Sequence, residues 1–214
     1  MIYAENILIC VAVPFVISLL FVKGAVRRYV AAFLLGMGMC LVSAYISGYL
    51  SVVTGFGENE TSIYISPIIE ELNKLLPLLF FMVMFIPKDN TLIMLAVAIG
   101  VGFATFENCC YILSFGAESI TYILIRGLAV GVMHVVSILC LAIWLIFVKR
   151  LKILSLPTVI GGTSLAMMFH ALYNLLVSKP GVSSIIGYLL PLFSAACLYP
   201  LYRKLPQLFR EKEK

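Results

Sequence analysis

The feature that most constrains this chain is an apolar run from Gly127 to Val148, which has 22 residues and no Asp, Glu, Lys or Arg. As a helix, about 20 such residues cross the hydrocarbon core of a bilayer. The whole chain has this character, since 63% of its 214 residues are hydrophobic and only 12% are charged, against about 25% in soluble domains. The sequence therefore predicts an all-α polytopic membrane protein. It excludes a β-barrel, whose strands are short alternating segments.

Seven apolar segments form one transmembrane domain over residues 1–214: 6–22, 29–53, 64–86, 91–113, 127–148, 156–177 and 182–202. With the N-terminus outside, 12 of the 15 Lys and Arg residues fall in the inner segments, which are 23–28, 87–90, 149–152 and 203–214. Because Lys and Arg favour the cytoplasmic side, we expect seven helices, an external N-terminus and a cytoplasmic C-terminus. The net charge of +5 then comes from basic residues that flank the helices at the surface of the lipid bilayer. No nucleic-acid partner is expected.

A small set of polar residues lies within or at the edges of these spans: Glu70, Glu71, Lys74, Glu107, Asn108, Arg126, His134, His170 and Asn174. An ionised group in hydrocarbon costs roughly 2.5–3.5 kcal/mol, so such residues either mark a functional site or neutralise one another. At about 1.5 Å per residue, the acids lie about 9 Å and the histidines about 11 Å below the outer ends of their spans. This common depth predicts a single site in the outer half of the bilayer, built by helices within residues 64–177.

The spacing of these residues along each helix agrees with a shared site. Lys74 lies four residues after Glu70 and three after Glu71, so either carboxylate can pair with it. The two glutamates point about 100° apart on a helix, so only one of them faces the centre of the site. Gly100 and Gly102 precede Glu107 on the same helix, which predicts that another helix approaches closely beside the site.

The residue types suit hydrolysis by either of two routes. A divalent metal such as zinc, with a water in its open position, would be bound by ligands drawn from Glu107, His134 and His170. Glu107 is alternatively an acid–base group. In a metal-free route, Glu70 or Glu71 would take a proton from the attacking water, with Glu70 the first choice. In that route the histidines hold the water. The sequence leaves both routes open.

The remaining polar residues have supporting functions in this interpretation. Asn174 orients the water or stabilises an oxyanion. Lys74 and Arg126 set the charge state of the carboxylates, although Arg126 also suits an interfacial position with its charge in the headgroups. Asn108, which directly follows Glu107, is expected to be a supporting residue. The same residue types also suit a proton-coupled transporter, whose acids and histidines form a relay, and a non-catalytic membrane immunity protein remains a further alternative.

These motifs together resemble the PrsW family of bacterial intramembrane proteases. The resemblance lies in EExxK at Glu70 to Lys74, FxxxE ending at Glu107, an arginine and a histidine at Arg126 and His134, and HxxxN from His170 to Asn174. It covers roughly residues 64–177. It implies a multi-pass endopeptidase of the bacterial cell membrane. The implied activity is the first, site-1 cleavage of a single-span membrane protein, such as an anti-sigma factor, near its extracytoplasmic face.

The motifs are also distantly similar to those of CAAX prenyl endopeptidases and of abortive-infection membrane proteins. Those families show EExxxR and FxxxH, whereas here the basic residue is Lys74, at the shorter spacing, and Glu107 stands in place of the histidine. A CAAX-type endopeptidase is therefore kept only as an alternative. The expected site in the outer half of the bilayer also disfavours an enzyme that faces the cytoplasm.

Overall fold

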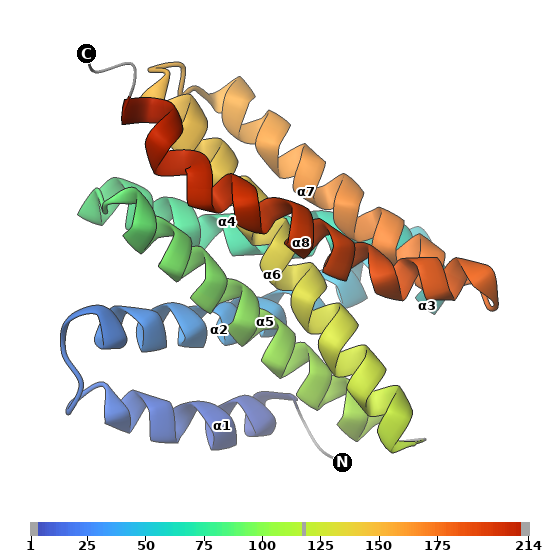
Figure 1. The fold of residues 1–214 in the computed structure, drawn as a ribbon. Coiled ribbons are helices and arrows are strands. Elements are labelled where there is room, and N and C mark those ends of the chain that lie inside the picture. The colour runs from blue at the N-terminus through green and yellow to red at the C-terminus, as the bar shows by residue number, and fades with distance from the viewer. Residues whose placement is uncertain (1–3, 117–118, 211–214) are drawn as a thin grey trace.

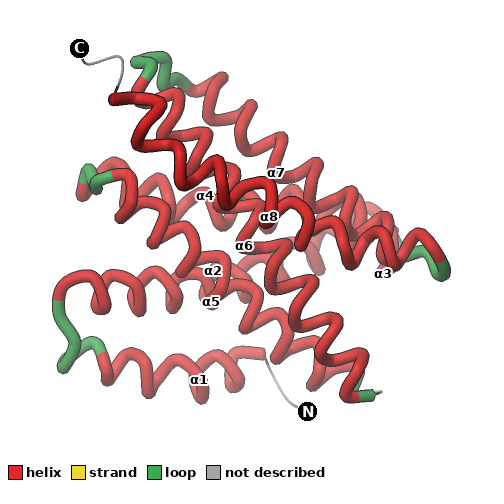
Figure 2. The backbone as a smooth tube through the Cα atoms, in the orientation of Figure 1, coloured by secondary structure: helices red, strands yellow, loops and turns green. Residues whose placement is uncertain are grey.

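The computed structural model describes residues 4–116 and 119–210, which fold into helices joined by short loops and contain no strand (Figure 2). The α-helices are α1 (Ala4–Ser18), α2 (Gly24–Thr54), α3 (Glu58–Glu60), α4 (Ser66–Phe85), α5 (Asp89–Phe115), α6 (Ile120–Arg150), α7 (Leu156–Val177) and α8 (Val182–Arg210). A π-helical turn, η1 (Thr61–Ile65), joins α3 directly to α4. The all-α prediction is confirmed.

Five helices in the described part of the chain are long and apolar enough to cross a membrane, and they are α2, α5, α6, α7 and α8. Two of the predicted spans differ from these. The first, α1, has only 15 residues and contains Pro14. The other, α4, has 20 residues but carries Glu70, Glu71 and Lys74 in its first half. The protein is thus a polytopic membrane protein, while the count of seven spans and the direction of the termini stay predictions.

Helices α5 and α6 form the centre of the bundle, and the other helices pack around them (Figure 1). α5 contacts α2 and α6 most extensively, and α7 packs against α4, α6 and α8. α1 lies along α2, at the side of the molecule away from α7 and α8. The main apolar core joins α2, α4, α5 and α6, and its fully buried side chains include Leu78, Ile99 and Ile146.

Three glycines bring the central helices close enough to fix their register. A Cβ added at Gly102 would lie 2.0 Å from the carbonyl oxygen of Phe33 in α2. A Cβ at Gly100 would lie 3.1 Å from the carbonyl oxygen of His134 in α6, and one at Gly36 would also meet α5 backbone. The predicted close approach beside the site is confirmed. These contacts hold α5 against α2 and α6 directly before the functional residues of α5.

Candidate active site

Four helices, α4 to α7, contribute polar residues predicted from the sequence to one cleft, and Tyr188 of α8 also lines it. The cleft has a volume of about 450 Å³ and is lined by residues that include Glu70 from α4, Glu107 from α5, Arg126 from α6, and His170 and Asn174 from α7. The π-helical turn η1 and α3 lie at its rim, where they contribute polar residues. Single π-helical turns are rare and frequently occur at functional sites. The structure therefore brings Glu70 and Asn174, which are 104 positions apart, into one polar site.

The two adjacent glutamates of α4 have different surroundings. Glu71 is fully buried, and its Oε1 accepts a hydrogen bond of 2.5 Å from the equally buried Nζ of Lys74. Lys74 Nζ also lies 3.1 Å from Ser137 Oγ and 3.1 Å from His134 Nδ1. Glu70 lies about 100° further round the helix and lines the cleft with its side chain 16% exposed. The prediction that only one glutamate faces the cavity is confirmed, and that glutamate is Glu70.

The buried glutamate orients the histidine of α7. His170 Nδ1 lies 2.8 Å from Glu71 Oε1. Because the ion pair with Lys74 keeps Glu71 an acceptor, we assign the ring proton of His170 to Nδ1. The other ring nitrogen, Nε2, is then a free lone pair that lies 3.8 Å from Glu70 Oε2. A carboxylate that fixes the tautomer of a histidine in this way is the usual support of a metal-binding histidine.

The second histidine belongs to a neighbouring charged cluster. His134 is fully buried, and its Nε2 lies 2.5 Å from Glu107 Oε2. Its ring packs 4.9 Å from that of Phe103 and 5.1 Å from that of His170. Arg126 Nη2 donates to the other oxygen, Glu107 Oε1, at 3.2 Å. Of the two positions that the sequence allows for Arg126, the structure therefore has the carboxylate partner.

The residues present fit a divalent metal ion. Ligand atoms of Glu70, His134 and His170 all lie within 4.8 Å of one another. Within the described residues, Glu70 Oε2 is buried and has no hydrogen-bond partner, which is costly for a carboxylate unless a cation or proton satisfies it. The sequence expects Glu107 rather than Glu70 as the carboxylate ligand. The two oxygens of Glu107 are instead bonded by Arg126 and His134, and its place as a ligand stays a prediction.

The two asparagines have different positions. Asn174 lines the cleft, and its Nδ2 donates to the backbone oxygen of Ser62 in η1 at 2.8 Å, which ties α7 to the rim. Asn108 does not join the cleft. It lies one residue beyond Glu107 on α5 and faces an apolar groove between α5, α6 and α8. The supporting function expected of Asn108 therefore does not arise from contact with the charged cluster.

Sequence reasoning missed the tyrosines of the cleft, which are Tyr111, Tyr122, Tyr173 and Tyr188. The hydroxyl groups of Tyr111 and Tyr122 lie 2.7 Å apart. The guanidinium of Arg126 stacks on the ring of Tyr111 at 3.4 Å from its centroid. Tyr111 lies four residues after Glu107, and Tyr122 lies four residues before Arg126. This i,i+4 spacing places each of these two tyrosines on the face of a charged residue, and it is the signal that could have identified the pair.

Comparison with known proteins agrees with this site. Residues 24–201 match the family described as PrsW family intramembrane metalloprotease. The matched region runs from α2 into α8 and includes the helices α4, α5, α6 and α7 that build the cleft. Neither the curated proteins nor the solved structures include a significant match to the chain. Since the family match covers well over half of the sequence, the chain belongs to the PrsW family of intramembrane metalloproteases.

Proposed function

We propose that this protein makes the first, site-1 cut in a single-span membrane protein, such as an anti-sigma factor, in a bacterial plasma membrane. Family membership already makes the protein an intramembrane peptidase. The observation that carries the catalytic proposal is a buried oxygen of Glu70 that has no hydrogen-bond partner and lies 3.8 Å from Nε2 of His170, whose Nδ1 is held by Glu71. An extracytoplasmic cut is supported by the rim of the cleft, since Glu58, Ser62 and Ser178 lie at the outer ends of their segments in the topology expected from the charges.

In this proposal, Glu70 and His170 would hold the divalent metal together with His134, whose Nε2 would have to exchange its contact with Glu107 for the ion. When bound, the ion supplies a water of lowered pKa and a Lewis acid for the scissile carbonyl. Glu71 and Lys74 do not line the cleft and act through His170 by fixing its tautomer. The proposal thus moves Glu70, the first choice as base from the sequence, into the ligand set, because its Oε2 has no hydrogen-bond partner and lies beside Nε2 of His170.

Glu107 is then the acid–base group of the cleft. Its side chain is 30% exposed, whereas that of Glu71 is fully buried, so a substrate and its water reach only the former. Glu107 takes a proton from the attacking water and returns it to the leaving amine. Arg126 holds the carboxylate in place. Asn174 has a second amide N–H beyond the one given to Ser62, and this group is available to the developing oxyanion.

The test is co-expression of the protein with tagged single-span anti-sigma-like proteins from the same genome, followed by a blot for the product. We expect wild type to release a fragment and Glu70→Gln to release none while remaining folded. Glu5→Gln, the same isosteric change in α1, is the matched control and is expected to leave cleavage unchanged. Sequencing of the new terminus reports the face of the cut.

Two results would contradict the proposal. Equal cleavage by Glu70→Gln and wild type would remove Glu70 from the site. A folded wild-type protein that cleaves no single-span candidate would remove this substrate class, and a flux assay would then test the transporter alternative.

A further inference from the structure

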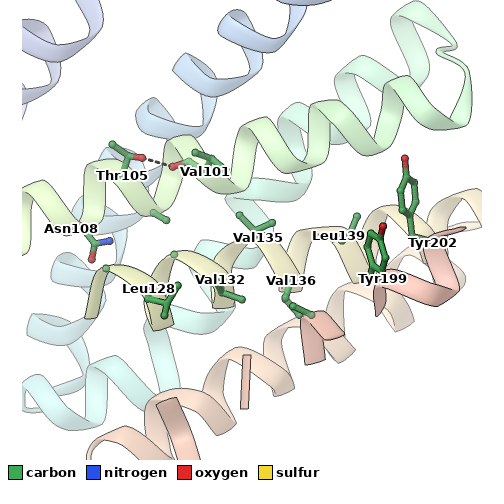
Figure 3. A pocket seen from close by; sticks show the side chains of 14 residues that line it. Val101, Thr105, Asn108, Leu128, Val132, Val135, Val136, Leu139, Tyr199 and Tyr202 are labelled. Carbon is green, nitrogen blue, oxygen red and sulfur yellow. Dashed lines mark hydrogen bonds between the residues drawn. The ribbon is translucent and has the colours of Figure 1, made fainter. Parts of the chain in front are cut away.

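A second cavity lies outside the charged cluster, on the side of the molecule formed by α5, α6 and α8 (Figure 3). This groove has a volume of about 530 Å³, and its walls are almost entirely apolar. Val101 and Thr105 of α5 form one wall, Val132 and Leu139 of α6 form the floor, and Tyr199 lies toward the far end on α8. The hydroxyl of Thr105 is bonded back to its own helix, so it does not seek a partner in the groove.

The groove lies next to the catalytic cleft. A small cavity of about 40 Å³ lies between them and shares Asn108 and Gly127 with the groove. The same small cavity shares Tyr111, Tyr122 and Arg126 with the cleft. Two of these five residues directly follow a charged residue of the cleft in sequence, since Asn108 comes after Glu107 and Gly127 after Arg126. One end of the apolar groove therefore lies beside two tyrosines and an arginine that also line the cleft.

We propose that the groove is the docking site for the transmembrane helix of the substrate. The inference rests on the proposed function and identifies where that substrate binds. The position of the groove beside the cleft selects this occupant, because a protease that cuts membrane-anchored chains must hold an apolar helix and still admit an unwound segment to its catalytic groups. The apolar walls of the groove can hold the helix, and the polar cleft can admit the unwound segment.

Two glycines suit the groove to a helix. Gly127 and Gly131 lie one turn apart on α6, and a Cβ added at either would meet no atom within 4 Å. In membranes, small residues at this spacing allow two helix backbones to approach closely. Docked there, a substrate helix would lie along α6 and end near Asn108, at the cleft end of the groove.

Asn108 lies where the docked substrate helix would unwind. Its Oδ1 is buried and has no hydrogen-bond partner among the described residues. A helix that opens in the membrane frees backbone N–H groups, which must find acceptors because lipid offers none. The amide of Asn108, after a small rotation toward the groove, supplies such an acceptor. Beyond it the extended chain passes the hydrogen-bonded pair Tyr111 and Tyr122 and reaches Glu107.

The first experiment fills the groove from its floor. Gly131→Leu places a large side chain where the substrate helix would lie, and the open space around Gly131 lets the protein itself accept it. We expect cleavage of the tagged single-span protein to fall by about tenfold, and less for Gly131→Ala. Gly161→Leu is the control, because this glycine of α7 also has open space but lines neither cavity. Thermal unfolding of all three variants checks that the loss does not come from the fold.

The second experiment asks what occupies the groove. A photo-crosslinking amino acid is placed at Leu128, which is 56% exposed in the groove, or at Leu165, which is 60% exposed on α7, each in the Glu70→Gln background. We expect an adduct with the span of the tagged protein from Leu128 and none from Leu165.

Adducts with lipid alone, or equal cleavage by Gly131→Leu and Gly161→Leu, would overturn the docking site. Because wild type still cleaves in either case, such a result leaves the proposed function intact. A wild type that cleaves nothing would instead fail the proposed function.

Discussion

The buried lysine of α4 offers the sharpest test of how the site is held together. Lys74 is fully buried, and its Nζ has Glu71 Oε1 at 2.5 Å and Ser137 Oγ at 3.1 Å as hydrogen-bond partners. At this separation and an effective dielectric constant of about 20, the attraction between the two charges is roughly 7 kcal/mol. The desolvation of two ions costs several kcal/mol each, so the intact pair contributes little net stability.

Removing only one partner of the pair is strongly destabilising. In Lys74→Met, Glu71 remains as a buried charge with no cation, and we expect the free energy of unfolding to fall by about 3–5 kcal/mol. In the double variant Glu71→Gln with Lys74→Met, neither charge remains, so most of that loss should return. Proteolysis should be abolished in the double variant, because His170 has lost the carboxylate that fixes its tautomer. It should be reduced in Lys74→Met, where Glu71 is present but has lost the cation that keeps it a hydrogen-bond acceptor.

The assay is denaturant unfolding in detergent, followed by the fluorescence of the single tryptophan. Trp144 reports on the fold because its Nε1 donates to Thr158 O at 2.7 Å and so joins α6 to α7. Cleavage of the tagged single-span protein is measured on the same samples. A single variant as stable as wild type, or a double variant no more stable than the single, would refute this account of Lys74. So would a double variant with full activity.

Further predictions concern packing and metal binding. Gly102→Ala should lower the free energy of unfolding by at least about 1–3 kcal/mol, because the new methyl group would lie 2.0 Å from the carbonyl oxygen of Phe33 in α2. Gly38→Ala, which has open space, should show no such loss in the same unfolding assay. His170→Ala should purify with less divalent metal than wild type by elemental analysis. Equal metal content in both proteins would exclude His170 as a ligand.

Much of the site follows from the sequence because membrane helices are regular. A charged residue inside an apolar run has few permitted positions, and the rise of a helix converts sequence number into depth. That is why Glu70, Glu107, His134 and His170 could be placed at one level before their contacts were known. The same regularity indicated that only one of two adjacent glutamates faces the cleft. It also marked Gly100 and Gly102 as points of close approach.

Helix regularity does not determine which faces of different helices meet. The spacing allows Lys74 to pair with either glutamate, and the choice of Glu71 depends on the α6 and α7 residues that surround it. In the same way, the bonds from Arg126 and His134 occupy Glu107, which leaves Glu70 as the acid nearest the free nitrogen of His170.

The sequence by itself thus determined the class of the protein and most of the charged residues that meet in the site, because hydropathy and helical period act along one chain. Only the tertiary structure decided the partners within the site, the exclusion of Asn108 from it, and the groove beside it. These depend on the rotation of each helix about its axis, which is set by packing between helices. The tight glycine contacts of α5 fix that rotation here, and they bring distant residues together.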